Sequence, residues 1–340
     1  MEILSFPGLG LEFELNPIAF EVFGWPIHWY GIIIACGFLL AVLYGYRKAP
    51  SLGVDQEKIF DMLFFAVPLC LIGARAYYVI FELDRYYNAD GSFNWGNAIA
   101  IWDGGLAIYG AIIMAVVTAV VYCYVRKQSF WDYADVGCYG LLIGQMIGRW
   151  GNFVNVEAYG SITDSFLRMS SESIANELWW KGLVETEEVY QSIIDGTLGV
   201  HPTFFYESVW NLLGFVILVL VARKGRKFSG QLFLSYVVWY GLGRAVIEGL
   251  RTDSLYFFET GLRTSQMLGL LSALVAIILM VILFKTAGPA TAPVPSSKEM
   301  EQMKKLRAEQ PAEEPAAGEK ESVSVEPEQK EEEDDGGDSN

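Results

Sequence analysis

Four polar residues between positions 240 and 253 have a spacing that places them on one side of a helix. They are Tyr240, Arg244, Glu248 and Arg251. Successive members are four, four and three residues apart, and residues at these intervals are neighbours on a helix surface. The arginine guanidinium is planar and permanently charged, and it binds phosphate through paired hydrogen bonds. This stripe therefore indicates a phosphate-like anion as ligand, with Glu248 spaced to pair with Arg244.

A second group of polar residues lies in the segment GRWGNFVNVEAYG, residues 148–160. Arg149 and Asn152 are three residues apart and share a helix face, and Asn155 and Glu157 follow them. The flanking glycines allow backbone N–H groups to approach a ligand closely. Other polar residues border or interrupt apolar stretches in DGGLAIYG (103–110), in HPTFFYE (201–207, ending in Glu207), and at Arg75.

These polar groups lie in or beside stretches that are apolar enough to cross a membrane. A bilayer core requires about 20 mostly apolar residues per helix. The chain has seven such stretches: 29–46, 59–81, 104–125, 134–155, 204–222, 231–249 and 264–284. We therefore predict an all-α integral membrane protein with seven transmembrane helices.

Ionisable side chains inside a membrane are costly, so each polar cluster is a hypothesis for a functional site that faces a polar interior. The alternative is that they are structural ion pairs that hold the helices together. The gathering of four clusters in one small bundle favours the functional interpretation.

The distribution of basic residues predicts how the helices are oriented. Basic residues concentrate in the loops after the first, third and fifth helices: Arg47, Lys48, Lys58, Arg126, Lys127, Arg223, Lys224, Arg226 and Lys227. Loops rich in lysine and arginine face the cytoplasm. The N-terminus is therefore predicted outside and the C-terminus inside.

The remaining segments complete the predicted domain organisation around a transmembrane domain at 28–285. Residues 1–27 contain three prolines and alternating apolar residues, so we expect an arm at the outer membrane interface. Residues 156–203 are too long for a plain connection and are predicted to form a small extracytoplasmic cap. Residues 286–340 hold fifteen acidic and six basic residues, which predicts a disordered acidic cytoplasmic tail. We expect a chain that lacks 290–340 to remain active.

Composition also argues against several classes of function. The absence of a basic stripe argues against a nucleic-acid partner. Two histidines and four cysteines without a CxxC pair provide little from which to build a zinc site. A transporter or channel, a metal-dependent phospholipid-headgroup enzyme and a non-catalytic lipid-binding protein are the alternatives. No internal repeat supports the first, and no aspartate cluster in an apolar stretch supports the second.

The segment at 148–160 closely resembles the signature of the prolipoprotein diacylglyceryl transferase family, in which Arg-x-Gly-Asn-Phe is followed by Asn, Glu and a final Gly. Other segments resemble this family in the same order: HWYG (28–31), DGGLAIYG (103–110), HPTFFYE (201–207) and RAVIEGLRTD (244–253). The resemblance extends over about residues 25–285 and does not include the acidic tail.

The resemblance implies an enzyme of the bacterial cytoplasmic membrane. Its members transfer the sn-1,2-diacylglyceryl group of phosphatidylglycerol to the thiol of the lipobox cysteine in a preprolipoprotein, whose signal peptide still lies in the membrane. The products are a thioether and glycerol-1-phosphate, and the reaction is the first step of bacterial lipoprotein maturation. The resemblance implies no metal or organic cofactor. The implied partners are phosphatidylglycerol, the preprolipoprotein and the surrounding membrane lipids.

The resemblance also implies roles for individual residues. Arg149 and Arg244 would hold the lipid phosphate and stabilise the leaving group. The headgroup site would be shaped by Asn152, Asn155 and Glu157, with Gly160 ending the signature. Three further residues match family positions that line the same cavity, namely Tyr30, Tyr240 and Glu248. Asp135 occupies a family acidic position and is expected to support the helix structurally.

Tyr109 is a departure from the family pattern, because many members have a histidine at this position. A neutral phenol is a much poorer proton acceptor than an imidazole at neutral pH. Either Tyr109 provides a hydrogen bond in place of the histidine, or the thiol is deprotonated elsewhere. The remaining groups are His28 and His201, Arg244 paired with Glu248, and the lipid phosphate itself. We include Tyr109 among the candidate catalytic residues, with Arg149, Arg244 and Glu248.

Overall fold

The computed structural model describes residues 2–88, 90–252 and 263–309. Residues 1–297 belong to one compact unit. Within the predicted tail, Ser297–Glu309 form helix α11, whereas residues 310–340 lie outside the described part of the chain.

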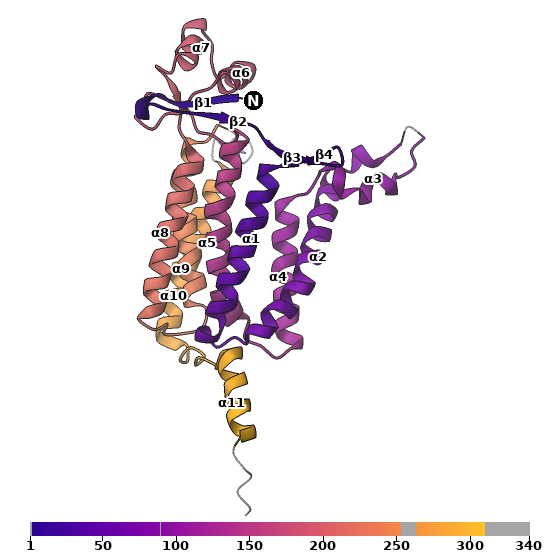
Figure 1. Ribbon diagram of the computed structural model, residues 1–340, viewed down its shortest axis with the longest axis vertical. Helices are drawn as coiled ribbons and strands as arrows, with labels where there is room; N and C mark the ends of the chain where they lie inside the picture. The colour runs from indigo at the N-terminus through magenta and orange to yellow at the C-terminus, as the bar shows by residue number, and fades with distance from the viewer. Residues whose placement is uncertain (1, 89, 253–262, 310–340) are drawn as a thin grey trace, which may run out of the picture. The chain divides into compact units, whose positions relative to one another are not determined.

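The main body is a bundle of long helices that run side by side (Figure 1). Among the described residues, seven helices have 17 or more residues: α1 (Trp29–Lys48), α2 (Gln56–Phe81), α4 (Ile108–Val125), α5 (Phe130–Val154), α8 (Thr203–Arg223), α9 (Gln231–Ile247) and α10 (Thr264–Thr286). Each contains most of one predicted apolar stretch. The prediction of a mainly helical membrane protein is confirmed.

Five of these helices are long and apolar enough to cross a membrane by length and composition: α1, α2, α4, α8 and α10. The two others differ for physical reasons. Helix α9 has only 17 residues, and α5 carries the charged residues Asp132, Asp135 and Arg149. Both helices pack among the others: α5 contacts α1, α8 and α9, and α9 also contacts α8 and α10.

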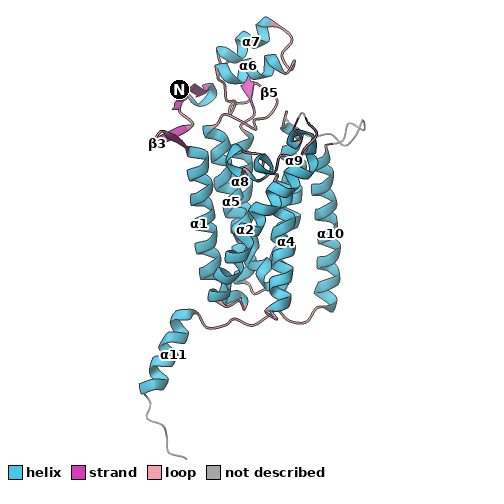
Figure 2. Ribbon diagram, turned by 90° about the vertical axis from the view of Figure 1, so that its right-hand side faces the viewer, coloured by secondary structure: helices cyan, strands magenta, loops and turns pink. Residues whose placement is uncertain are grey.

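The described residues also include strands, which the all-α prediction did not contain. They form three two-stranded antiparallel sheets: β1 (Glu2–Phe6) with β2 (Leu11–Leu15), β3 (Ile18–Val22) with β4 (Trp25–His28), and β5 (Ile162–Thr163) with β6 (Gly199–Val200). Alternating apolar residues in the N-terminal arm suit strands because successive side chains point to opposite faces. Figure 2 shows strands at the same end of the bundle as the short helices α6 (Glu172–Trp180) and α7 (Glu187–Ile194).

The first hairpin and the segment predicted as a cap share one apolar core. Leu4 is fully buried with Ile174 and Leu178 of α6. The backbones of Ser5 and Ser170 exchange hydrogen bonds of 2.8 and 2.9 Å. The N-terminal strand thus joins the cap, although more than 160 residues separate the two segments.

Glycines allow two helix pairs to approach so closely that backbones touch. A Cβ atom at Gly110 of α4 would lie 2.2 Å from the carbonyl oxygen of Gly73 on α2, and one at Gly241 of α9 would lie 2.3 Å from that of Gly269 on α10. Small residues at such contacts bring helices together in membranes, where van der Waals packing drives association.

Helices α8 and α9 are joined by a reciprocal pair of tryptophans. The indole N–H of Trp210 donates to the backbone carbonyl of Trp239 at 3.0 Å, and that of Trp239 donates to the carbonyl of Trp210 at 2.9 Å. Their rings are stacked 4.3 Å apart. Gly243 and Gly214 leave room for the two rings. This contact fixes the relative position of the two helices that carry Glu207 and Arg244.

A buried ion-pair network lies at the opposite end of the bundle from the cap. Arg226 contacts Asp132 and Asp135 at 2.8 Å each, and the three side chains are at most 6% exposed. Asp135 also accepts backbone hydrogen bonds from Gly230 and Phe233 at the start of α9. The carboxylate therefore caps a helix across the bundle, in agreement with the structural role expected for Asp135.

The segment that follows α10 packs against this network. We call residues 287–297 the C-terminal strap. The Thr291 hydroxyl donates to Asp132 at 2.6 Å, the Val294 N–H to the carbonyl of Pro50 at 2.9 Å, and the Ser297 N–H to the side chain of Gln56 at 2.8 Å. The start of the predicted tail thus belongs to the folded unit.

We expect two truncations on either side of this boundary to behave differently. A chain ending at Ser297 keeps these hydrogen bonds and should unfold at the wild-type temperature. A chain ending at Gly288 loses them, at a cost on the order of 2–3 kcal/mol, which should lower the unfolding temperature by roughly 5 °C or more. Thermal unfolding in detergent measures both. Equal unfolding temperatures would show that the strap adds no stability.

Candidate active site

Three arginines converge on one buried carboxylate near the cap end of the bundle. Glu207 of α8 is 6% exposed. Its Oε2 lies 2.5 Å from Nη2 of Arg149 on α5. Its Oε1 lies 3.6 Å from Nη1 of Arg244 on α9 and 3.7 Å from Nη1 of Arg251. Side chains from separate segments of the chain thus form one charged cluster, which we call the arginine cluster.

Glu248 is a second carboxylate in this cluster. It is 2% exposed, and its Oε2 lies 2.7 Å from Nη2 of Arg244, one helical turn earlier. The backbone carbonyl of Glu248 accepts a hydrogen bond from Arg263, just before α10. The predicted Arg244–Glu248 pair is therefore present, and it links α9 to the start of α10.

The signature segment 148–160 extends the cluster through a chain of hydrogen bonds. Arg149 donates to the side-chain oxygen of Asn152 at 3.3 Å, and the amide of Asn152 donates to Glu157 at 2.8 Å. The Asn155 amide also donates to the same oxygen of Glu157, at 3.4 Å. All four predicted side chains are thus brought together, with Glu157 at the outer end.

The loop that carries Glu157 has unusual backbone geometry on both sides of this residue. Val156 has φ of 51° and Ala158 has φ of 56°. Left-handed conformations cost non-glycine residues free energy and occur often at functional sites. The hydrogen bonds of Glu157 and the packing of Val156 and Tyr159 in the cap core hold this conformation. In this conformation the Glu157 carboxylate accepts hydrogen bonds from both asparagine amides.

Gly160, Tyr30 and Tyr240 take different places around this site. A Cβ atom at Gly160 would lie 2.7 Å from that of His201 and 2.9 Å from the carbonyl of Leu250, so this glycine lets the signature loop pass close to the segment that follows α9. The ring of Tyr30 packs on the backbone of Gly151, two residues from Arg149. Tyr240 lies one turn before Arg244 and stacks on Tyr236.

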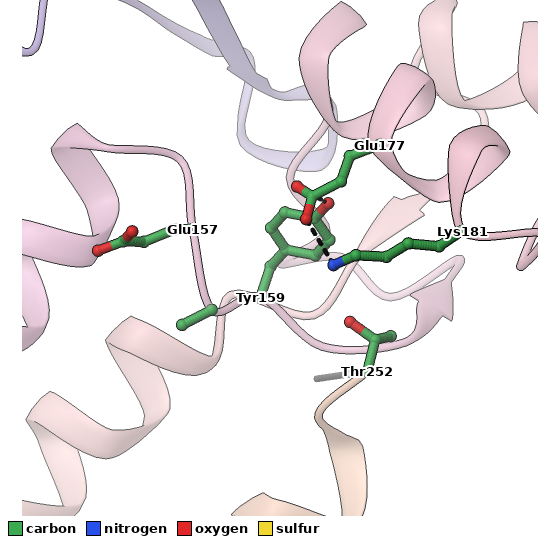
Figure 3. A pocket seen from close by; sticks show the side chains of 6 residues that line it. Glu157, Tyr159, Glu177, Lys181 and Thr252 are labelled. Carbon is green, nitrogen blue, oxygen red and sulfur yellow. Dashed lines mark hydrogen bonds and ion pairs between the residues drawn. The ribbon is translucent and has the colours of Figure 1, made fainter. Parts of the chain in front are cut away.

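A polar pocket of about 290 Å³ opens beside Glu157. Figure 3 shows Glu157 on one side of it and the ion-paired Glu177 and Lys181 of α6 on the other. The Tyr159 hydroxyl donates to Glu177 at 2.6 Å, and Thr252 completes the lining with Ala158. The pocket thus places polar groups of the cap next to the end of the hydrogen-bond chain from Arg149.

Tyr109 lies apart from the arginine cluster in the described contacts. It is the second residue of α4 and is 46% exposed. Its ring contacts Tyr77 of α2. The loop before it is held by Arg75, which is buried and donates to the backbone carbonyls of Asn97, Ala98, Gly104 and Gly105. Arg75 therefore orders the loop that leads to Tyr109.

The two histidines are also outside the cluster. His28 ends β4, where it pairs with Ile18. His201 lies before α8, and its Nδ1 is 3.2 Å from the Tyr206 hydroxyl. Burial lowers the pKa of the His201 imidazole below its usual value. These contacts agree with a structural role for both residues.

The model of one protein family, described as prolipoprotein diacylglyceryl transferase, matches residues 17–282. The chain belongs to this family. It is 43% identical over 277 residues to the phosphatidylglycerol–prolipoprotein diacylglyceryl transferase of Oceanobacillus iheyensis, covering 80% of this chain and 89% of the relative. The identically named protein of Listeria welshimeri is 45% identical over 272 residues, covering 79% and 90%. That of Bacillus velezensis is 42% identical over 270 residues, covering 78% and 92%.

The diacylglyceryl transferase family match includes the whole arginine cluster and ends before the C-terminal strap. The sequence pattern predicts most of the cluster but not its centre. In the sequence Glu207 is only the last residue of HPTFFYE, and its distance along the chain from Arg149 conceals their contact. The available signal was a carboxylate in the second turn of an apolar helix, which in a membrane requires a partner.

For a diacylglyceryl transferase, the geometry of the cluster matches an anionic ligand. Guanidinium groups from different helices, preorganised around one point, stabilise negative charge where it develops without reorganisation. The described part of this family member therefore contains three guanidinium groups gathered around one buried carboxylate within an apolar bundle.

Proposed function

We propose that the chain transfers the diacylglyceryl group of phosphatidylglycerol to the cysteine thiol of prolipoproteins, as the names of its relatives describe for those proteins. The observation that carries the proposal is the convergence of Arg149, Arg244 and Arg251 on one point inside an apolar bundle. A phosphodiester is the anionic part of phosphatidylglycerol, and arginine forks bind it bidentately. The proposed acceptor is the lipobox cysteine of a preprolipoprotein held in the membrane by its signal peptide.

The proposed reaction is a substitution at carbon. The thiol loses its proton, and its sulfur forms a bond to the terminal glyceryl carbon of the diacylglyceryl group. The bond between that carbon and the phosphate oxygen breaks, and its electron pair goes to the oxygen. The products are a thioether and glycerol-1-phosphate. The oxygen that leaves with the phosphate either keeps the new negative charge or takes up the proton that the thiol released. Arg149 and Arg244 stabilise this developing charge.

The headgroup glycerol fits the polar residues of the signature. Its two hydroxyls require acceptors and donors, which a carboxylate and two amides supply. Glu157 accepts and Asn152 and Asn155 donate, with Tyr30 and Tyr240 beside them. The adjacent polar pocket at Glu177 and Lys181 gives the released glycerol-1-phosphate a path to the outer face.

The topology that supports this reaction has seven transmembrane helices, an outer N-terminus and an inner C-terminus. Seven transmembrane helices are supported by the apolar composition of five helices and by the packing of α5 and α9 among them. The orientation in the membrane is supported by the basic loops after α1, α4 and α8. In this arrangement 1–27 is an outer arm, 156–203 an extracytoplasmic cap and 286–340 a cytoplasmic tail, of which residues 310–340 lie outside the described part of the chain. The site then faces the side from which secreted prolipoproteins are modified.

The experiment that tests the function is transfer by purified protein in detergent. Phosphatidylglycerol and a synthetic lipobox peptide are mixed with it, and both the peptide mass and the released glycerol phosphate are followed. We expect both products in equal amounts, and neither with a peptide in which serine replaces the cysteine. Folded protein that yields no product would contradict the proposal.

Tyr109→Phe tests the residue that departs from the family pattern. We propose that the Tyr109 hydroxyl donates a hydrogen bond to substrate, so its removal should lower the transfer rate on the order of tenfold, as expected for one lost hydrogen bond. Tyr77→Phe, which removes a hydroxyl from the neighbouring ring, is the matched control. An unchanged rate in folded Tyr109→Phe would remove Tyr109 from the mechanism.

A further inference from the structure

Glu207 occupies the point to which the arginines converge, and this raises the question of what it does there. Three guanidinium groups at such short separations repel one another, and burying them without a counter-charge is unfavourable. Glu207 supplies negative charge within 4 Å of all three. Together with Glu248, which lies 2.7 Å from Arg244, Glu207 thus offsets the repulsion within the cluster.

The carboxylate is a poor geometric match for the cluster. Oε2 is at hydrogen-bonding distance from Arg149, but Oε1 is 3.6 Å from Arg244 and 3.7 Å from Arg251. These two separations exceed those of hydrogen bonds. Among the described residues, Oε1 has no hydrogen-bond partner, although it is buried. A planar carboxylate thus satisfies one arginine well and two poorly, whereas a tetrahedral phosphate presents oxygens in several directions.

We propose that Glu207 is a resident anion that the lipid phosphate displaces from the arginine cluster, and that its return expels the phosphate product. This inference rests on the proposed function, because it assumes that a lipid phosphate binds the cluster. Glu207 acts here as a specificity-determining residue and takes no part in bond making or breaking.

Charge explains why the product would be expelled more strongly than the substrate. The substrate is a phosphodiester with one negative charge, equal to that of the carboxylate it displaces. The product is a phosphate monoester, which carries roughly −1.5 to −2 at neutral pH. Close like charges in a site of low dielectric repel strongly. Glu207 should therefore weaken the binding of glycerol-1-phosphate more than that of phosphatidylglycerol.

Glu207→Gln tests the proposal, since it removes the charge and keeps the shape. Binding of glycerol-1-phosphate is measured by its effect on thermal unfolding, with neither lipid nor peptide present. We expect binding at least about tenfold tighter than in the wild type, together with stronger product inhibition of transfer and a lower kcat. Glu188→Gln, the same change on the exposed face of α7, should bind as the wild type does. Equal or weaker binding by folded Glu207→Gln would overturn the proposal.

A second variant covers the case in which Glu207→Gln does not fold. Glu207→Asp keeps the charge and draws it back from Arg149 by one methylene. We expect tighter binding of glycerol-1-phosphate by roughly threefold, because the carboxylate competes less well, and no tightening would overturn the proposal. The wild-type transfer assay separates the two ideas. Absence of transfer there contradicts the proposed function, whereas transfer with unaltered product binding in the variants contradicts only the role of Glu207.

Discussion

Arg149→Ala is expected to abolish transfer while the protein still inserts and folds. Arg149 makes the shortest contact in the arginine cluster, and it also links that cluster to Asn152. Loss of one preorganised donor at a developing negative charge typically lowers kcat by on the order of 10²–10³-fold. Since the charge is removed as well, the loss should reach at least the upper end of this range. Transfer of diacylglyceryl to a lipobox peptide measures it.

Two further variants are the controls for this result. Arg149→Lys keeps the charge but loses the planar fork, so transfer should be partly retained. Arg85→Ala removes an exposed arginine that pairs with Glu82 and donates a hydrogen bond to the Tyr78 hydroxyl, and transfer should be unaffected. Rapid transfer by correctly inserted Arg149→Ala would exclude this arginine from the phosphate site.

Arg226→Ala is expected to cause the largest loss of stability. The change leaves Asp132 and Asp135 buried without their guanidinium partner, and the backbone carbonyl of Leu52 also loses its donor. Breaking a buried ion pair by removing one partner costs about 3–5 kcal/mol. The unfolding temperature in detergent should fall by roughly 10 °C.

The neighbouring arginine is the control for this change. Arg223 is exposed at the end of α8, and Arg223→Ala should unfold within about 2 °C of the wild type. If Arg226→Ala matched it, the network would contribute little, and the start of α9 would be held by other contacts. Below its unfolding temperature, Arg226→Ala should transfer at the wild-type rate, because the network lies at the opposite end of the bundle from the arginine cluster.

The helices could be predicted from sequence because length and hydropathy determine them locally. The stretch predicted at 29–46 forms Trp29–Lys48, and the one at 264–284 forms Thr264–Thr286. The i, i+4 pair of Arg244 and Glu248 was predictable for the same reason, since helix geometry alone brings the two side chains together. The proximity of Arg149 and Asn152 follows equally from their spacing.

Contacts between distant segments could not be predicted in this way. The position of Glu207 depends on how α8 packs against α5 and α9, which no periodicity reveals. The strap was hidden because an acidic tail follows it, and composition averaged over 286–340 obscures the few residues that bind the bundle. The N-terminal hairpin appeared only as alternating apolar residues, and nothing in them indicated that β1 completes the cap core.

The stacked indoles of Trp210 and Trp239 have an optical consequence. Two such chromophores 4.3 Å apart couple their electronic transitions, and where the two transition moments are skewed this coupling appears in circular dichroism as a paired band of opposite signs. The band depends on the contact between α8 and α9, the helices that hold Glu207 and Arg244. It therefore reports, without an added label, whether α8 and α9 keep this contact in a given detergent or lipid.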